Sequence, residues 1–482
     1  MRDSLKASET FFLIPSGSVP RSLLRLRVDI RHGYPAACCG VIHYHGIAFF
    51  VLTQNLGTLM LIEIYPAHSA NQGERPPIHM VPDHKLKIAV LIRRFISTGG
   101  AERYALEVTR RLALCHEVHV FAQEWSYTGE ENITFHKIPR FFVKPSWLNQ
   151  LLFSYFTRKA AGSSFDIVHS HEKVTQFDIM TVHSPCFRSF ITQERRRWKR
   201  ILIWFSVFFS PRELAWLWLE KKEFAHKKGR LLIAVSENVK KNVMANYPLP
   251  DLYFRLAYPG VDLDMSHREG HKDDVEMLRS QLGIARDQIA ILFVGTEFKR
   301  KGLEGLLRGF ALMPYSNLKL VIAGEGGGKL EEFKNLARSL GIHNHVLFLG
   351  LVKEIHKLYR LADIYILPTL SDPFGMAPFE AMASGVATIM SSSDFAGSAE
   401  HIQCGEALLL RNPEDPKEIA ASLLKLMDPD CRAELGRRGQ RLAAGLTWEK
   451  TTANTLCAYD EVLRQKRCAA KYRQNGILAC VS

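Results

Sequence analysis

From residue 85 onward, short apolar runs rich in β-branched residues alternate with longer amphipathic segments. The first set of runs predicts buried strands at 87–94, 117–122, 165–171, 179–184 and 231–236. The segment 99–113 follows the first strand directly and has the apolar spacing of a helix. Strands that alternate with helices in this way indicate a parallel sheet with helices on both faces.

The same pattern restarts in the second half of the chain. It predicts strands at 289–296, 318–326, 345–350, 363–369, 386–392 and 407–411. The stretch around 260–285 is polar and aperiodic, which indicates a link, and 448–466 predicts a closing helix. We therefore expect an α/β protein with two doubly wound domains, at 85–262 and 263–447, and a closing helix and tail at 448–482.

Residues 1–84 have neither a helical period nor a strand followed by a helix. We expect them to form a leader of uncertain order. A protein that lacks residues 1–79 is expected to fold and to keep its activity.

The positive net charge of the chain indicates an anionic partner. The 482 residues include 63 Lys and Arg against 49 Asp and Glu, a net charge of +14 that points to nucleic acid, an anionic lipid surface or a phosphorylated substrate. With 47% hydrophobic and 23% charged residues, the composition excludes a wholly disordered chain.

Ligands of doubly wound sheets bind beyond the carboxyl ends of the strands, so the loops there carry the candidate chemistry. Gly99 and Gly100 come between the first strand and its helix, where backbone N–H groups can approach a phosphate, although a simple tight turn would also explain them. After the strand 289–296, Arg300 and Lys301 provide cations for a diphosphate. The alternative there is a solvated basic turn.

The segment 371–385 follows the strand 363–369 and carries the strongest signal. Gly375 allows a tight turn, and Pro378 suits the first turn of a helix. Asp372 and Glu380 bracket this turn, and carboxylates accept hydrogen bonds from the vicinal hydroxyls of a sugar or a ribose. An acidic cap and one exposed helix glutamate would explain either residue alone but not the arrangement.

Three histidines lie at predicted strand ends in the first domain: His169, His171 and His183. Buried structural histidines are the common alternative, but we expect at least one of the three to contact the donor sugar or the acceptor. Asp178 is a candidate acceptor-side carboxylate. Metal binding by His169 and His171 would need two further ligands that the sequence does not offer.

A basic cluster leads into an aromatic stretch farther along the first domain. The cluster and its first tryptophans are Arg195, Arg196, Arg197, Trp198, Lys199, Arg200 and Trp204. Cations followed by apolar rings are typical of a segment that lies on an anionic membrane surface. A core helix with a basic loop is the alternative, and no nucleic-acid-binding module accompanies the cluster.

Taken together, these segments resemble the family 4 retaining glycosyltransferases of the GT-B fold over residues 86–466. The resemblance rests on Asp372 and Glu380 with seven residues between them, on Gly99 and Gly100, and on the segments 236–243, 258–262 and 358–369. The sequence departs from the family at Asp372, where Glu is usual, and at Thr296, where Arg is usual. The segments around Gly99 and Arg300 look like those of lipopolysaccharide core glucosyltransferases that act on heptose.

The resemblance implies a role for each candidate. Arg300 and Lys301 would hold the donor diphosphate, Glu380 the ribose and Asp372 the donor sugar. His183 is a further candidate for the catalytic site, chosen from its place at a strand end. The remaining donor contacts would come from Gly99, Gly100, Gly350, Phe374, Gly375, Met376 and Ala377. Transfer would proceed with retention and without a metal or another cofactor.

The same resemblance implies a substrate pair and a location. The donor would be a UDP-sugar, with glucose as the hexose, and the acceptor a lipid-linked core oligosaccharide at the cytoplasmic face of the inner membrane. A mannosyl- or N-acetylglucosaminyltransferase, a nucleotide-sugar epimerase and a non-enzymatic nucleotide-binding scaffold are the alternatives. Nucleic acid is not an expected partner, and the sequence does not predict an oligomeric state.

Overall fold

The protein is described by a computed structural model. It describes residues 85–482 apart from 130–131, 163, 193–196, 226–228, 264–271, 404 and 475–482, and five strands within residues 1–84. Packing divides the chain into two units, Met1–Met80 and Val81–Ser482. The smaller unit contains two antiparallel sheets, one of β1 (Ser8–Phe11) and β2 (Leu26–Asp29), the other of β3 (Cys39–Tyr44), β4 (Ile47–Leu52) and β5 (Tyr65–Pro66). The rest of the expected leader lies outside the described residues.

The first sheet of the larger unit is parallel throughout, with the order β10-β8-β6-β11-β12-β13-β14. Its strands are β6 (Lys87–Leu91), β8 (Glu117–Ala122), β10 (Ile133–Lys137), β11 (Ile167–Ser170), β12 (Ile179–Val182), β13 (Leu231–Ala234) and β14 (Phe254–Leu256). The five predicted strands are all present. The apolar pattern misses the two edge strands, because β10 is partly exposed along its whole length and β14 has only three residues. Two short strands form a separate parallel pair: β7 (Arg94–Phe95), which follows β6, and β9 (Glu124–Trp125), which follows β8.

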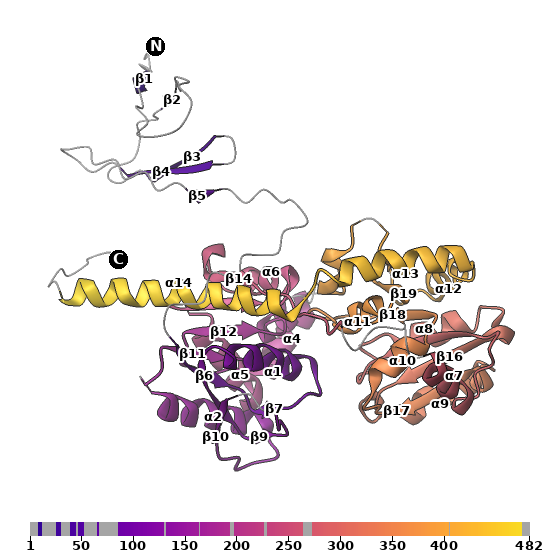
Figure 1. Ribbon diagram of the computed structural model, residues 1–482. Coiled ribbons are helices and arrows are strands. Elements are labelled where there is room, and N and C mark those ends of the chain that lie inside the picture. Colours follow the sequence, from indigo (N-terminus) through magenta and orange to yellow (C-terminus); the bar gives the residue numbers. More distant parts are fainter. Residues whose placement is uncertain are drawn as a thin grey trace. The chain divides into compact units, whose positions relative to one another are not determined.

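Helices connect these strands (Figure 1). They are α1 (Gly100–Ala113), α2 (Ser146–Ala161), α3 (Phe187–Thr192), α4 (Arg197–Phe208), α5 (Pro211–Glu223), α6 (Glu237–Asn246) and the 3-10 turn η1 (Asp251–Tyr253). Two of them begin at serine caps: Ser210 Oγ accepts the Glu213 N–H before α5, and Ser236 Oγ accepts the Val239 N–H before α6. Local capping therefore fixes where α5 and α6 start.

The second sheet is also parallel throughout, with the order β17-β16-β15-β18-β19-β20. Its strands are β15 (Ile289–Val294), β16 (Leu318–Ala323), β17 (Val346–Gly350), β18 (Ile364–Leu367), β19 (Ala387–Ser391) and β20 (Leu408–Leu410). The α-helices here are α7 (Lys272–Gln281), α8 (Leu303–Phe310), α9 (Leu330–Ser339), α10 (Ile355–Leu361), α11 (Ala377–Ala383), α12 (Pro416–Lys425) and α13 (Pro429–Ala443). Four 3-10 turns complete it, η2 (Tyr315–Asn317), η3 (Gly326–Gly328), η4 (His343–His345) and η5 (Gly397–His401). The predicted α/β class with two doubly wound sheets is confirmed.

Strand order explains which loops come together. In the first sheet β6 lies between β8 and β11, and in the second β15 lies between β16 and β18. The chain reverses its winding direction at these points, which is where ligands of doubly wound sheets bind. In the second sheet these loops carry the cations after β15 and the acidic segment after β18.

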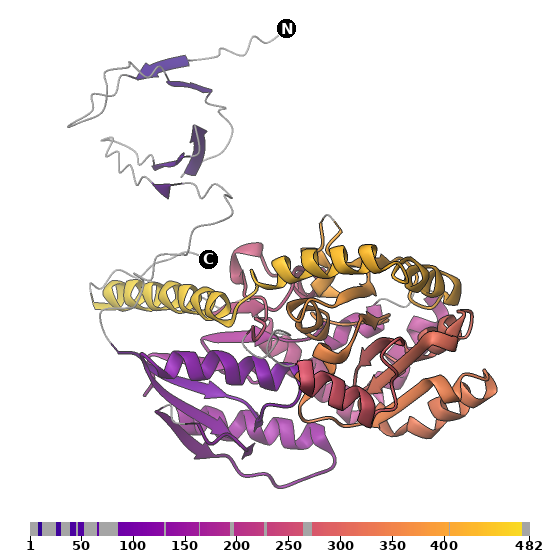
Figure 2. The same ribbon diagram turned by 45° about the vertical axis from the view of Figure 1, so that its right-hand side comes forward.

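The final helix returns to the first sheet. Helix α14 (Trp448–Gln474) begins at the predicted residue, continues beyond the predicted end and lies alongside α1 (Figures 1 and 2). Its Tyr459 hydroxyl lies 2.8 Å from His169 Nδ1, and its buried Trp448 stacks edge-on against Tyr104 of α1. At Gly260 a side chain is impossible, because a Cβ atom there would lie 2.2 Å from the Trp448 nitrogen. The closing helix is therefore built into the core of the first domain.

Candidate functional site

The loops after β15 and β18 cross each other closely. Arg300 Nη1 donates to the Ser371 carbonyl at 2.6 Å, and the Leu370 N–H donates to the Arg300 carbonyl at 2.9 Å. Gly302 makes the crossing possible: it has a φ of 77°, and a Cβ atom there would lie 1.7 Å from the Pro368 oxygen. The basic loop is thus held against the acidic one by one side-chain and one backbone hydrogen bond.

Lys301 and Asp372 form an ion pair at this crossing. Their side chains are only 14% and 9% exposed, so water screens the pair weakly. The Asp372 N–H donates to the Phe395 carbonyl at 2.8 Å, which fixes the backbone below the carboxylate. Gly375 has a φ of 80°, and a Cβ atom there would lie 2.9 Å from Asp372 Oδ2. The glycine therefore leaves room for the carboxylate.

Glu380 lies on α11 and binds two side chains. Arg103 of α1 forms an ion pair with its Oε1, and the Tyr359 hydroxyl of α10 donates to Oε2 at 2.7 Å. The Glu380 carboxylate is the main cause of a raised pKa at Arg103, which therefore stays cationic. Burial raises the pKa of Tyr359, and the nearby Glu380 charge adds to this effect. Neither Arg103 nor Tyr359 is predicted from the sequence.

The glycine loop of the first domain faces the acidic segment of the second. A Cβ atom on Gly100 would lie 3.9 Å from Met376 Cε, so the two loops are neighbours. Gly99 has a φ of 98°, and a Cβ atom there would lie 2.4 Å from Glu102 Oε2. Helix α11 starts at Ala377, directly after Met376, with proline in its first turn as predicted.

The other glycines of the second domain have different surroundings. Gly350 ends β17 with a φ of 69°, accepts the Gly324 N–H at 2.7 Å, and has open space where a Cβ atom would lie. A Cβ atom on Gly324 would lie 1.8 Å from the Gly295 oxygen, and one on Gly326 would contact the Phe298 ring at 2.7 Å. Close packing thus accounts for Gly324 and Gly326, whereas nothing lies within 4 Å of a Cβ atom at Gly350.

The three predicted histidines have unequal surroundings. His169 is fully buried, and its ring nitrogens lie 2.8 Å from Tyr459 Oη and from Thr181 Oγ1. Burial lowers its pKa to about 3. Both His169 nitrogens are therefore occupied inside the core, which argues against His169 as an acceptor-side residue.

His171 and His183 form a pair farther along the same strand ends. His171 Nδ1 lies 3.1 Å from His183 Nε2, and both rings pack against Tyr104. Burial lowers the pKa of His171 well below its usual value and that of His183 to about 3, so both are neutral near pH 7. His171 is 8% exposed and buried, whereas His183 keeps a partly exposed surface. Of the three, His183 is best placed to reach a ligand.

Asp178 does not lie with these residues. It immediately precedes β12, so it lies at the amino edge of the parallel sheet, opposite the strand ends that carry the histidines. There it accepts the Val168 N–H at 2.8 Å and pairs with Lys466 of α14 at 2.7 Å. The placement corrects the expectation of an acceptor-side carboxylate: Asp178 fastens the closing helix.

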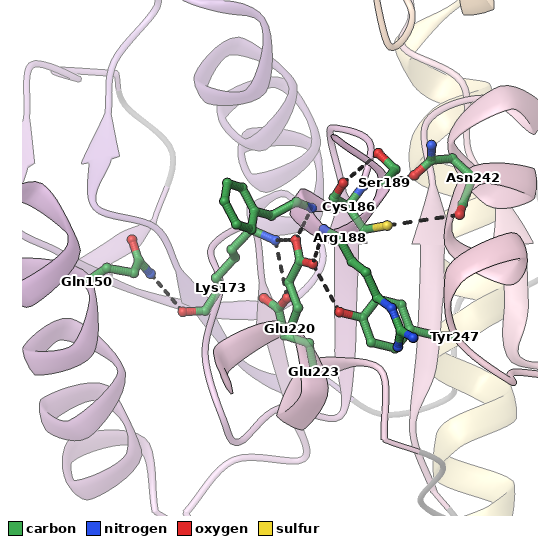
Figure 3. Close-up of polar contacts among 10 residues, drawn as sticks. Gln150, Lys173, Cys186, Arg188, Ser189, Glu220, Glu223, Asn242 and Tyr247 are labelled. Atoms are coloured by element: carbon green, nitrogen blue, oxygen red, sulfur yellow. Dashed lines mark hydrogen bonds and ion pairs between the residues drawn. The ribbon is translucent and has the colours of Figure 1, made fainter. Parts of the chain in front are cut away.

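A buried charge cluster that no sequence pattern predicts lies beside the strand-end loops (Figure 3). Lys173 Nζ lies 2.9 Å from Glu220 Oε1 and 3.4 Å from Glu223 Oε2, and both glutamates of α5 are buried. Glu220 also accepts the backbone N–H groups of Phe187 and Arg188, at the start of α3. The cluster therefore ties α3 and α5 to the loop after β11.

The predicted membrane-facing segment is a helix with exposed rings. On α4 and just after it, Trp198, Ile201, Leu202, Trp204, Phe205, Phe208 and Phe209 are between 43% and 69% exposed. This exposure argues against a core helix. Arg195 and Arg196 lie outside the described residues, as do the side chains of Arg197, Lys199 and Arg200. Trp218 of α5 is also exposed and lines a groove of about 550 Å³ with Leu151, Tyr155, Arg158 and Leu214.

Within the described part of the chain, no group of three or more His, Cys, Asp or Glu residues is arranged to hold a metal ion. None of the helices there is both long enough and apolar enough to cross a membrane.

Comparison with known proteins assigns both domains. Residues 98–265 match Glycosyltransferase Family 4, and residues 274–441 match Glycosyl transferases group 1. D-inositol 3-phosphate glycosyltransferase of Corynebacterium jeikeium is 30% identical over 48% of this chain and 57% of that protein. Lipopolysaccharide glucosyltransferase WaaG of Escherichia coli is 21% identical over 67% of this chain and 84% of that protein. The chain spans about half the length of the first curated relatives that it matches.

Solved structures share the two-domain fold. The crystal structure of WaaG matches with a TM-score of 0.67 and 19% identity, over 77% of this chain and 98% of that chain. Anabaena Alr3699/HepE in complex with UDP-glucose matches with a TM-score of 0.59 and 17% identity, over 79% of this chain and 99% of that chain. The chain therefore belongs to the glycosyltransferases of the GT-B fold, with a family 4 domain followed by a group 1 domain.

Proposed function

We propose that the protein is a retaining glycosyltransferase that moves glucose from UDP-glucose to a membrane-borne oligosaccharide of the lipopolysaccharide-core type. The observation that carries the proposal is the pairing of Lys301 with Asp372, next to the carboxylate of Glu380 that Arg103 holds from the other domain. Cations for a diphosphate and carboxylates for sugar hydroxyls then lie at one crevice. These are the groups that a nucleotide-sugar requires.

The donor would bind mainly to the second domain. Lys301 and Arg300 would face the diphosphate, Glu380 would accept the ribose hydroxyls, and Asp372 would accept hydroxyls of the hexose. The open backbone at Gly350 leaves space for the base. Gly99 and Gly100 would approach the phosphates from the first domain, since their loop lies beside Met376.

Catalysis would depend on the leaving diphosphate. As the bond between the sugar and the diphosphate breaks, negative charge grows on the phosphate oxygens, and fixed cations stabilise it by roughly 3–4 kcal/mol each. Transfer on the same face of the sugar would retain the configuration at the anomeric carbon without a metal ion. His183 is neutral near pH 7, so it would contribute hydrogen bonds to the hexose rather than a positive charge.

Similar proteins support two kinds of acceptor. WaaG is a lipopolysaccharide glucosyltransferase, and the structure of Alr3699/HepE holds UDP-glucose. Other relatives are D-inositol 3-phosphate glycosyltransferases, which makes a small phosphorylated acceptor the second candidate. The exposed rings of α4 favour the membrane-borne acceptor, because a soluble acceptor gives no reason to display them.

Membrane binding is part of the same proposal. The protein would lie on the cytoplasmic face of the inner membrane as a peripheral protein, with the rings of Trp198, Trp204 and Phe208 at the lipid headgroups. Arg195, Arg196, Arg197, Lys199 and Arg200 would add attraction to anionic lipids, worth roughly 1 kcal/mol for each cation near the surface.

A nucleotide-sugar array tests the reaction. UDP-, GDP- and ADP-sugars are screened for thermal stabilisation and then for transfer, with the product anomer read by NMR. UDP-glucose is expected to stabilise the protein and to yield a product of retained configuration. Glu380→Gln should abolish transfer without unfolding the protein, whereas Glu434→Gln, an exposed change on α13, should not. An isomerised UDP-sugar formed without acceptor would instead make the protein an epimerase.

Vesicle binding tests the location. Wild-type protein should sediment with vesicles that contain anionic lipid and much less with neutral ones, and Trp198→Ser with Trp204→Ser should reduce this binding. Leu424→Ser removes a similarly exposed apolar side chain from α12 and serves as the control. Equal binding of wild type to both vesicle types would refute a charge-dependent membrane surface.

A further inference from the structure

Side chains from both domains contact the Glu380 carboxylate. Arg103 approaches it from α1 of the first domain, and Tyr359 approaches it from α10 of the second. The Arg103 and Glu380 side chains are 26% and 14% exposed, so the pair is largely shielded from water. Each oxygen of the carboxylate has one partner, which fixes the plane of the group.

Arg103 is arranged differently from the other cations of its helix. Arg110 and Arg111 both pair with Glu107 on α1, and Arg111 also reaches Glu449 of α14. Arg103 instead extends from the first turn of α1 toward the other domain. Its own N–H donates to the Gly99 carbonyl at 3.0 Å, so its position is tied to the glycine loop that faces Met376.

We propose that Arg103 is a positioning residue that couples nucleotide binding in the second domain to the approach of the first. The inference rests on the proposed function in one respect, the role of Glu380 as acceptor of the donor ribose hydroxyls. Arg103 holds the charged carboxylate in the orientation that the ribose needs. A bound ribose in turn fixes the carboxylate for Arg103, which favours the arrangement with the two loops together.

Removing Arg103 leaves the shielded Glu380 charge without its cation. A partly buried carboxylate that loses its partner turns toward water or takes up a proton, and either change weakens its bonds to ribose hydroxyls. Losses of this kind cost several kcal/mol in other proteins, and a tenfold change corresponds to about 1.4 kcal/mol. We expect Arg103→Ala to weaken UDP binding on the order of tenfold or more and to lower kcat/KM further.

The test measures UDP binding by calorimetry, which does not depend on turnover. Wild type, Arg103→Ala, Arg103→Lys and the control Arg110→Ala are compared, followed by the same Arg103→Ala change in a Glu380→Gln background. Arg103→Lys should recover part of the affinity, since it restores the charge but not the fork geometry. In the Glu380→Gln background, Arg103→Ala should add less than about twofold.

The outcomes separate this inference from the proposed donor. If the wild-type protein does not bind UDP but binds ADP or GDP, the proposed donor is wrong. The same variants are then measured with the nucleotide that binds. Equal affinity of Arg103→Ala and Arg110→Ala for that nucleotide would overturn the coupling. So would losses that multiply independently in the Arg103→Ala, Glu380→Gln double variant.

Discussion

Lys301 pairs with Asp372 although 70 residues separate them in the chain, because β15 and β18 are neighbours at the point where the strand order of the second sheet reverses. The loops that follow these strands therefore leave the same edge of the sheet side by side. The proposed diphosphate-binding cation and the proposed sugar-binding carboxylate are therefore in direct contact.

Lys301→Ala is expected to lower kcat/KM for the donor by roughly 100-fold, because one fixed cation at the leaving diphosphate is lost. Asp372→Asn should reduce turnover as well. The two effects should combine to less than their product, because the residues contact each other. Steady-state kinetics of the single and double variants measure this, with Arg308→Ala, an exposed change on α8, as the control. Independent effects would mean that the pair does not act at one site.

Sequence patterns predict the features of this fold that depend on neighbouring residues, but not the contacts between residues far apart in the chain. Strong apolar runs predict each central strand, and position at a strand end suffices to group Lys301 with Asp372. The half-exposed β10 has no such run. Arg103 and Glu380 are separated by 277 positions and by a domain boundary, so no local pattern links them. The place of His169 at a predicted strand end suggests a functional role, but the hydroxyl of Tyr459, on the last helix, lies 2.8 Å from its Nδ1.

Gly302→Ala should destabilise the protein more than Gly341→Ala. Both glycines have φ near 75°, so alanine strains both backbones by roughly 1–2 kcal/mol. At Gly302 the new Cβ atom would also lie 1.7 Å from the Pro368 oxygen, whereas nothing lies within 4 Å at Gly341. Thermal unfolding should place Tm of Gly302→Ala lower by roughly 5 °C or more, and donor binding should weaken with it. Equal Tm values would show that the loop crossing is looser than described.

His183→Ala is expected to lower transfer more than tenfold and to lower Tm only modestly, because the ring is partly exposed, although His171 Nδ1 loses its contact at 3.1 Å. His169→Ala should do the reverse, since it deprives Tyr459 and Thr181 of a buried partner, a loss worth about 1–3 kcal/mol. The pKa of His183 is lowered to about 3, so its titration should not change the rate between pH 6 and 8. Transfer rates and Tm measured on both variants decide the assignment, and wild-type turnover in His183→Ala would remove this residue from the site.

Glu223 should make the stability of the first domain depend on pH. Burial raises its pKa to about 7 from an ordinary 4.5, and its Oε1 is buried without a hydrogen-bond partner. The folded state therefore favours the protonated acid: the resulting stabilisation is fully present below pH 4.5 and is lost as the pH rises through about 7.

Glu223→Gln resembles the protonated form at every pH and should not lose this contribution. Relative to wild type, its free energy of unfolding should rise by roughly 3 kcal/mol between pH 4.5 and 7.5. Urea unfolding across this range measures the difference, with Glu213→Gln, at a less buried position of α5, as the control. A difference that does not change with pH would mean that Lys173, whose Nζ lies 3.4 Å from Glu223 Oε2, keeps Glu223 ionised in the folded protein.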